Sequence, residues 1–191
     1  MVKINELKNF SEVINGKLLF NYNLKKTNWF NIGGIAKVFF KPDGLNELIS
    51  FIKKFRKKEK IFLLGAGSNI LINDKTFNGI VIKLGKKFSN ISLLNDNIIV
   101  AGSSATDKKL AEFACENNIG GLEFLSCIPG SVGGGLRMNS GCFDKEFKDI
   151  LLSVQALDNN AKIITIPASE IKFGYRENNL DKNLIFFKCI F

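Results

Sequence analysis

Apolar positions in the first half of the chain repeat with the periods of strands and helices. Ala36–Phe40 predicts a strand, and apolar residues recur at the helical period from Leu45 to about Lys58. Ile61–Leu64 is a short continuous apolar run, which predicts a buried strand, and Gly79–Lys83 predicts another. The order is β-α-β, and proteins built in this way usually bind ligands at the carboxyl ends of their strands.

Shorter, mostly strand-like runs follow in the second half. Ile91–Leu94 and Asn97–Ala101 flank a polar pair, which predicts a hairpin. Thr106 suits the N-cap of a helix from Asp107 to about Asn117, in which Asp107 favours the first turn. Further strands are expected at Leu152–Asp158, Ile163–Ile166 and Leu184–Phe191. We therefore expect an α+β protein of two lobes, residues 1–86 and residues 87–191.

The formal net charge of +9 changes this picture little. Only three of the 27 basic residues are arginines, whereas proteins that read nucleic acids depend on arginine. The dense cluster Lys53–Lys58 lies in the predicted helix, so we interpret it as a solvated helix face and expect no nucleic-acid partner. No apolar run reaches the roughly 18 residues that span a bilayer, and Met1–Glu6 has no signal-peptide core. These patterns predict a cytoplasmic protein with no membrane partner.

The residue inventory excludes several kinds of catalytic site. The chain has no histidine, which excludes Ser-His-Asp triads, Cys-His nucleophiles and histidine-based zinc or haem sites. Its four cysteines show no Cys-x-x-Cys spacing, so we expect reduced thiols and no metal, with Cys115 and Cys189 as small core residues. Chemistry is therefore expected from a bound cofactor.

The first glycine loop, Gly65–Ile70, follows the predicted buried strand. It departs from the dinucleotide fingerprint, because Ile70 takes the third glycine position and no acidic residue follows about 20 positions later. Gly65 and Gly67 still let consecutive N–H groups converge on an anion, and Ser68 and Asn69 add side-chain donors. A tight turn after a strand explains the same residues equally well.

The second glycine loop, Ile128–Gly134, is the stronger signal. One proline and four glycines fall within Pro129–Gly135, a composition that disfavours a helix or strand interior. It suits a backbone that approaches a flat or charged ligand, followed by a short helix whose amides face a phosphate. A flexible surface loop is the alternative, which the apolar run Leu122–Ile128 disfavours.

Six blocks of the sequence resemble the UDP-N-acetylenolpyruvoylglucosamine reductase family, flavoenzymes that complete UDP-N-acetylmuramate for bacterial peptidoglycan. The blocks occur in the family's order and cover almost the whole chain, which makes the match highly specific. They are Thr27–Gly34, Leu64–Ile72, Gly121–Ser126, Ile128–Gly134, Arg137–Gly141 and Phe173–Arg176.

The resemblance implies a vanillyl-alcohol-oxidase-like (PCMH-type) FAD-binding fold of two α+β lobes, with FAD between them. It also implies that NADPH reduces the flavin and leaves, and that the enolpyruvyl ether of the UDP-sugar then receives the hydride. Arg176 matches the family's active-site arginine, whose guanidinium stabilises charge pushed onto the substrate carboxylate. Substrate contacts are implied for Arg176 and Tyr175, and Asn139 is expected to shape their pocket. FAD contacts are implied for Gly65, Ala66, Gly67, Ser68, Asn69, Ile70, Ile128, Pro129, Gly130, Ser131, Val132, Gly133, Gly134 and Gly141.

The sequence also departs from the family. A third domain supplies the family's proton-donating serine and an assisting glutamate, and neither can be assigned because the sequence stops at Phe191. Asn178 and Asn31 stand where the family usually has Ser and often has Arg. Cys127 replaces a glycine, for which a tolerated small residue is favoured over a redox or covalent role. We therefore expect FAD binding but little or no turnover of the UDP-sugar, since general acid catalysis contributes about 10²–10⁴-fold.

Two other functions fit the same residues. One is a flavin-binding module without catalysis, and the other is a different oxidoreductase of this fold that acts on a sugar or lactone. The block Gly174–Arg176 argues against the second of these. A nucleic-acid-binding protein rests on net charge alone.

Overall fold

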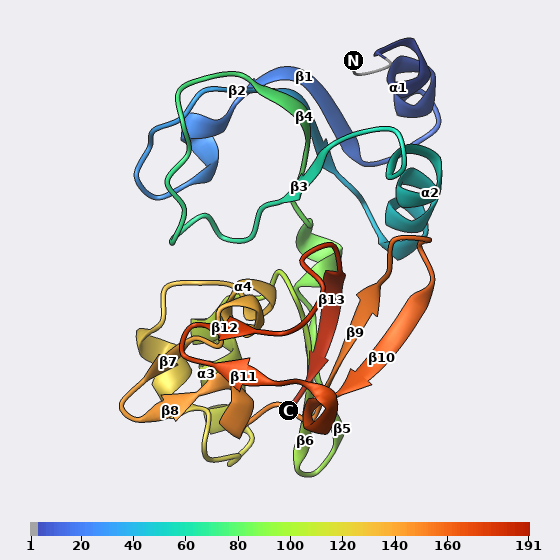
Figure 1. Ribbon diagram of the computed structural model, residues 1–191. Helices are drawn as coiled ribbons and strands as arrows, with labels where there is room; N and C mark the ends of the chain where they lie inside the picture. Colours follow the sequence, from blue (N-terminus) through green and yellow to red (C-terminus); the bar gives the residue numbers. More distant parts are fainter. Residues whose placement is uncertain (1–3) are drawn as a thin grey trace. The chain divides into compact units, whose positions relative to one another are not determined.

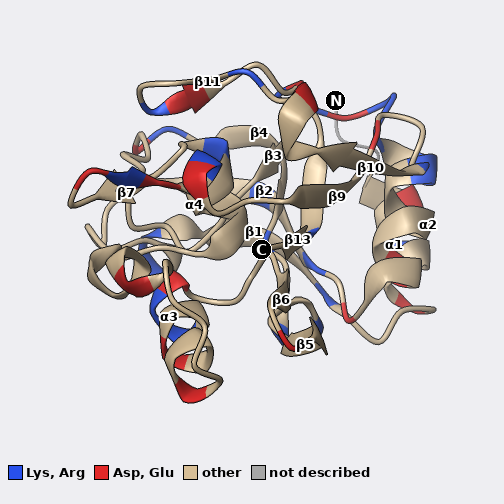
Figure 2. Cartoon of the chain, turned by 90° about the horizontal axis from the view of Figure 1, so that it is seen from below, with Lys and Arg blue, Asp and Glu red and all other residues tan. Residues whose placement is uncertain are grey.

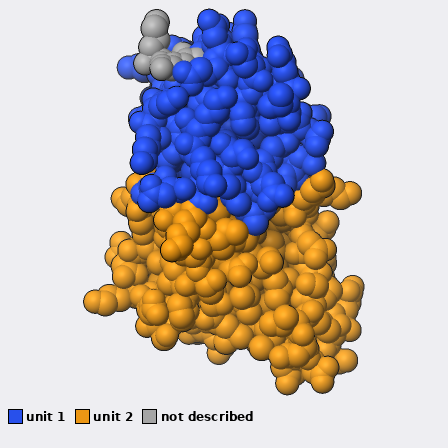
Figure 3. Space-filling view, turned by 90° about the vertical axis from the view of Figure 1, so that its right-hand side faces the viewer, with its two compact units in different colours: residues 1–85, 159–161 blue, residues 86–158, 162–191 orange. Residues whose placement is uncertain are grey.

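Separate groups of buried side chains divide the chain into two units. The computed structural model describes residues 4–191, and Met1–Lys3, part of the segment considered as a signal peptide, lie outside the described residues. Unit 1 comprises Met1–Gly85 with Asn159–Ala161, and unit 2 comprises Lys86–Asp158 with Lys162–Phe191 (Figure 3).

Unit 1 is built on a mixed sheet in the order β1-β2-β4-β3 (Figure 1). β1 (Lys17–Asn23) is antiparallel to β2 (Ile35–Lys41), while β3 (Ile61–Leu63) and β2 both run parallel to β4 (Phe77–Ile82). The helix α2 (Leu45–Phe55) connects β2 to β3. The predicted β-α-β order is thus confirmed.

Aromatic rings fill one side of this sheet. Phe51 of α2 stacks on Phe40 of β2 with ring centroids 4.1 Å apart. Phe10 of α1 (Ile4–Ser11) meets Phe51 and Phe55 edge-on at 5.6 and 5.5 Å. Lys53 and Lys54 are exposed on α2, as the interpretation of the basic cluster as a solvated helix face predicts, whereas Arg56–Lys58 lie beyond the end of the helix.

The predicted strand at Ile61–Leu64 is confirmed as β3, but the prediction that it is buried is wrong. β3 lies at the edge of the sheet, and its Phe62 is 41% exposed, with its ring against Phe77. Only Leu64, one residue beyond the strand, is buried. A short apolar run does not distinguish the edge of a parallel sheet from its centre, because both carry apolar side chains.

Unit 2 contains an antiparallel sheet in the order β10-β9-β13-β6-β5 (Figure 1). The predicted hairpin is confirmed as β5 and β6, and the three predicted late strands as β9, β10 and β13. These strands are β5 (Ile91–Asn95), β6 (Ile98–Gly102), β9 (Ser153–Leu157), β10 (Ile163–Pro167) and β13 (Ile185–Ile190).

Two helices pack on this sheet. α3 (Asp107–Glu116) begins as predicted, because the hydroxyl of Thr106 accepts a hydrogen bond from the amide of Lys109 at 3.2 Å. α4 (Val132–Arg137) is the short helix expected at the second glycine loop. The expectation that Cys115 is a core residue is wrong: it lies one position after the buried Ala114, and the helical turn of about 100° per residue carries it to the exposed face. Cys189 of β13 is fully buried, as expected.

Charges of both signs share the surface of α3, as Figure 2 shows. The Nζ of Lys108 lies 3.7 Å from the Oε1 of Glu112, one helical turn away. None of the helices within residues 4–191 is both long enough and apolar enough to cross a membrane.

Candidate functional site

The first glycine loop runs beside the segment Thr27–Gly34 in unit 1 (Figure 1). The amide of Trp29 donates to the carbonyl of Gly67 at 3.0 Å. A Cβ added to Gly67 would stand 2.3 Å from the carbonyl oxygen of Thr27 and 2.8 Å from the Cα of Asn28. Gly67 also has φ +82°, a left-handed conformation that disfavours other residues. The close approach of the two segments therefore requires glycine here.

The main-chain amides of this loop are its main chemical feature. Within residues 4–191, none of the amides from Gly65 to Ile70 donates a hydrogen bond, and the side chains of Ser68 and Asn69 make none either. Amides that are not paired within the protein are available to water or to a ligand. A run of consecutive N–H groups without acceptors is the arrangement by which loops bind phosphates.

A lysine beneath the same loop adds positive charge. Lys83 donates from Nζ to the carbonyls of Thr27 at 3.3 Å and Ala66 at 3.5 Å. Burial, together with the nearby charge of Lys41, lowers the pKa of Lys83. No carboxylate within residues 4–191 pairs with Lys83. The unbalanced charge suits an anionic ligand.

Ile70 differs from the other residues of the loop. Its side chain packs against the small core cluster of unit 1 that contains Leu24, Phe39 and Val81. Ile70 thus anchors the loop to the sheet through its side chain, and only its amide is left for a ligand.

The second glycine loop, in unit 2, offers fewer amides than its composition implies. The amides of Val132 and Gly133 donate to the carbonyls of Ala105 and Ser103, each at 2.9 Å. The amides of Gly130, Ser131 and Gly134 donate to no acceptor in the described part of the chain. The bonds to residues 103–105 fix the loop, and three amides are left to face a ligand.

A buried carboxyl group lies against this loop. Asp107 is 0% exposed, and neither of its carboxyl oxygens has a hydrogen-bond partner in the described chain. A Cβ added to Gly130 would stand 2.5 Å from the Oδ2 of Asp107. Burial raises the pKa of Asp107 to about 7. Asp107 was expected to favour the first turn of α3, but its carboxyl group accepts no hydrogen bond from the amides of that turn.

Arg176 projects from the turn of a short hairpin, β11 (Phe173–Gly174) and β12 (Glu177–Asn178). Its Nη1 donates to the carbonyl of Asn139 at 3.2 Å and its Nη2 to that of Gly141 at 3.0 Å. The guanidinium lies 4.9 Å from the ring centroid of Tyr175, whose side chain is exposed. The structure thus brings together Arg176, Tyr175, Asn139 and Gly141.

Asn139 and Glu146 form the support beneath Arg176. Asn139 is fully buried and donates from Nδ2 to Glu146 Oε2 and the carbonyl of Gly174, both at 3.0 Å, while its Oδ1 accepts from the amide of Lys148. Glu146 also pairs with Lys148 at 2.7 Å and with Arg176 at 3.6 Å. The hydrogen bond from Lys148 holds the pKa of Glu146 below its usual range. Asn139 therefore positions its neighbours, because its own side-chain atoms are all engaged.

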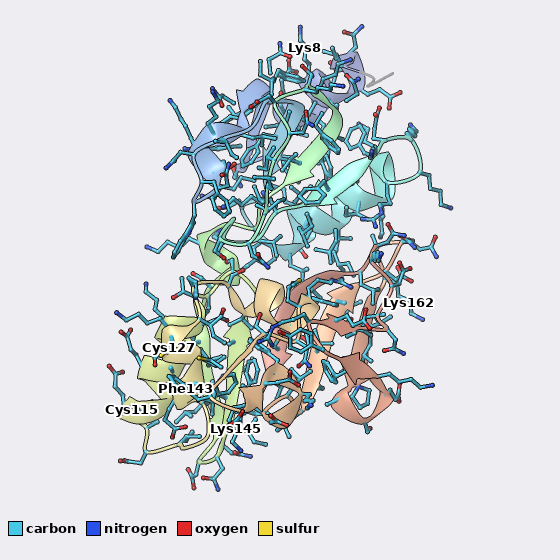
Figure 4. The ribbon with its side chains drawn as sticks, turned by 60° about the vertical axis from the view of Figure 1, so that its left-hand side comes forward. Lys8, Cys115, Cys127, Phe143, Lys145 and Lys162 are labelled. Atoms are coloured by element: carbon cyan, nitrogen blue, oxygen red, sulfur yellow. The ribbon has the colours of Figure 1, made fainter. Side chains whose placement is uncertain are left out.

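Cys127 lies on a cavity of about 290 Å³ in unit 2. Phe143, at the tip of the hairpin formed by β7 (Gly141–Cys142) and β8 (Lys145–Glu146), has φ +52° and is 77% exposed. Figure 4 shows Cys127 and Phe143 close together on the same side of unit 2. The cavity is lined by Glu123, Phe124, Ser126, Cys127, Phe143 and Lys145.

Sequence reasoning missed three residues of these sites. Lys83 was predicted only as the end of a strand, and the available signal was its positive charge near the position where the dinucleotide fingerprint has an acidic residue. Asp107 was predicted only to favour the first turn of a helix, and its burial against the second glycine loop was not predicted. Glu146 lies in a region with no recognisable motif, so no signal in a single sequence identified it.

Comparisons with known proteins show the family of the chain. The family described as "FAD binding domain" matches residues 36–167. A UDP-N-acetylenolpyruvoylglucosamine reductase of Pelagibacter ubique is 59% identical over 190 residues, which cover 100% of this chain and 63% of that protein. The protein of the same name from Rickettsia canadensis is 46% identical, over 94% of this chain and 60% of its own length. The chain thus spans about three fifths of the length of these curated relatives, and the resemblance noted in the sequence is confirmed.

Solved structures agree on the fold. The crystal structure of UDP-N-acetylenolpyruvylglucosamine reductase from Thermus caldophilus has a TM-score of 0.78 at 26% identity, covering 92% of this chain and 61% of that chain. BBE-like 1 from Physcomitrella patens, in its D396N variant, has a TM-score of 0.68 at 16% identity, covering 97% of this chain and 43% of that chain, and shows the fold alone. The predicted vanillyl-alcohol-oxidase-like fold is confirmed, and the chain belongs to the FAD binding domain family.

Proposed function

We propose that the chain is the FAD-binding portion of an NADPH-dependent reductase that converts UDP-N-acetylglucosamine enolpyruvate to UDP-N-acetylmuramate in the cytoplasm, for peptidoglycan synthesis. The names of the relatives from Pelagibacter and Rickettsia support the reaction. In this proposal the amides of the first and second glycine loops donate hydrogen bonds to the diphosphate of FAD.

The single observation that carries the proposal is the run of unpaired amides from Gly65 to Ile70, above a lysine without a carboxylate partner. A diphosphate would satisfy these donors and balance the charge of Lys83. The three unpaired amides of Gly130, Ser131 and Gly134 would serve the same purpose in unit 2.

FAD binding is testable by absorption spectroscopy of the purified chain after incubation with FAD and removal of the excess. We expect a stoichiometric flavin spectrum, because the unpaired donors of the loops gain an anionic partner. Lys83→Met should weaken FAD binding about 10-fold, since it removes one charge-assisted interaction. Lys182→Met, which removes a lysine from an exposed position in unit 2, is the matched control. Absence of bound flavin in the unmodified chain would refute the proposal.

FAD supplies the hydride-carrying ring, and Arg176 would hold the carboxylate of the enolpyruvyl group beside it. The guanidinium keeps its place through the carbonyls of Asn139 and Gly141 and through Glu146. Its side chain is 37% exposed, which leaves part of the charged group open to a ligand. A planar fork of donors suits a carboxylate better than a single ammonium does.

Replacement of Arg176 should separate substrate binding from cofactor binding. We expect Arg176→Met to weaken binding of UDP-N-acetylglucosamine enolpyruvate about 10- to 100-fold, because one charge-assisted contact is lost, and Arg176→Lys to weaken it less. The change in the bound flavin's spectrum on titration with this ligand measures the effect without turnover. UDP-N-acetylglucosamine, which lacks the carboxylate, is the control ligand. Equal affinity of Arg176→Met and the unmodified chain would contradict this role.

A further inference from the structure

The segment Thr27–Gly34 contains two neighbouring aromatic residues that the core does not use. Trp29 is 61% exposed and Phe30 is 57% exposed. Neither ring contacts another aromatic ring within residues 4–191, and the indole N–H donates to no acceptor there. Large aromatic rings that a fold leaves open are typical of ligand-binding surfaces.

These rings are held next to the first glycine loop. The amide of Trp29 itself donates to the carbonyl of Gly67, and Lys83 bridges the carbonyls of Thr27 and Ala66. Asn28, between them, is buried and donates to the carbonyls of Leu24 and Ile32. The backbone that carries Trp29 is therefore fixed against the loop whose amides are unpaired.

A second observation at this place also points to a ligand. The Oδ1 of Asn28 is buried and has no hydrogen-bond partner within the described residues. An acceptor buried without a donor is costly, so a donor on a ligand or a water is expected beside it. Unpaired donors, an unpaired acceptor and open aromatic rings thus occur together within two adjoining segments of unit 1.

We propose that Trp29 stacks on the adenine ring of FAD, next to the amides of the first glycine loop. This inference rests on the proposed function. FAD carries a planar ring on each side of its diphosphate, and in the proposed function the hydride-transferring ring is the one that lies beside Arg176. The adenine is then the ring left for unit 1.

The test compares ligands that carry one ring each. Trp29→Ala should weaken binding of FAD and of ADP about 10-fold, as expected for the loss of one base–aromatic stacking contact, and should leave the affinity for FMN unchanged. Trp29→Phe retains a ring and should change affinity for FAD and ADP by less than about 3-fold. Calorimetric titration gives the affinities for FAD and FMN, and displacement of FAD gives that for ADP.

Val13→Ala is the matched control, because it removes another exposed apolar side chain from unit 1, and circular dichroism confirms that each variant is folded. A loss of affinity for FAD and FMN with unchanged affinity for ADP would mean that Trp29 faces the flavin ring and would overturn the adenine assignment. Equal affinities of Trp29→Ala and the unmodified chain would overturn any stacking role. Failure of the unmodified chain to bind FAD would instead refute the proposed function.

Discussion

Gly67→Ala should reduce the affinity of the chain for FAD by at least about 100-fold. The new Cβ would stand 2.3 Å from the carbonyl oxygen of Thr27 and 2.8 Å from the Cα of Asn28. Both are backbone atoms, so no flexible side chain can move aside. The variant also places a non-glycine residue at φ +82°, which costs about 1–2 kcal/mol by itself.

The effect is large because the clash forces the two segments apart. Relief of the clash requires the first glycine loop to move away from Thr27–Gly34, and this movement breaks the hydrogen bond from Trp29 to Gly67. It also withdraws Ala66 from Lys83. Amides that bind a diphosphate must hold their positions within a few tenths of an ångström, since hydrogen bonds weaken steeply with distance and angle.

Gly121→Ala is the control for backbone strain alone. Gly121 has φ +94°, but a Cβ added there meets no atom within 4 Å. This variant should lose about 1 kcal/mol of stability and retain its affinity for FAD. Titration with FAD followed by flavin fluorescence compares the two variants, and urea unfolding measures their stabilities. Wild-type affinity in a folded Gly67→Ala chain would show that the loop does not bind the cofactor.

Local sequence patterns predicted the elements of the fold well where side-chain periodicity and burial agree. Three elements depend only on residues close together in the sequence, and one sequence is therefore enough to predict them. They are the apolar face of α2, the N-cap at Thr106 and the hairpin of β5 and β6. The edge position of β3 depends on which elements lie alongside, and periodicity does not contain that information. The exposure of Cys115, by contrast, follows from its place one residue after the buried Ala114 on α3.

The candidate site divides in the same way. Gly67 was recognisable because close backbone approach demands glycine. Which amides remain unpaired was not recognisable, since the partners of Val132 and Gly133 come from residues 103–105, nearly 30 positions away. Lys83 and Glu146 gained their significance only when folding placed them beside Ala66 and Arg176.

Asp107→Asn should change the pH dependence of stability more than any other single substitution of a carboxylate in unit 2. Burial without a hydrogen-bond partner raises the pKa of Asp107 from 3.8 to about 7 in the folded chain. Its neighbours do not compensate, because Ser103 also has an unpaired hydroxyl and burial raises the pKa of the Cys189 thiol, which stays neutral.

The direction of the effect follows from proton binding in the two states. Below about pH 4 the carboxyl is protonated in both states and adds no pH dependence. Between about pH 4 and 7 the unfolded chain releases the proton and the folded chain keeps it, so the free energy of unfolding falls by up to about 1.4 kcal/mol per pH unit. Above about pH 7 the carboxyl is ionised in both states, and the loss in the free energy of unfolding stays constant.

Asp107→Asn does not titrate, so its stability relative to the parent should rise from pH 4 to pH 7 and then level off, with a total gain of up to about 4 kcal/mol. Urea unfolding of both proteins at pH 4.5, 6 and 8 measures this difference, in which the other carboxylates cancel because both chains contain them. Asp96→Asn serves as the control, because it replaces a carboxylate that is already exposed to water in the turn between β5 and β6. A difference between Asp107→Asn and the parent that stays constant from pH 4.5 to 8 would show that folding does not raise the pKa of Asp107.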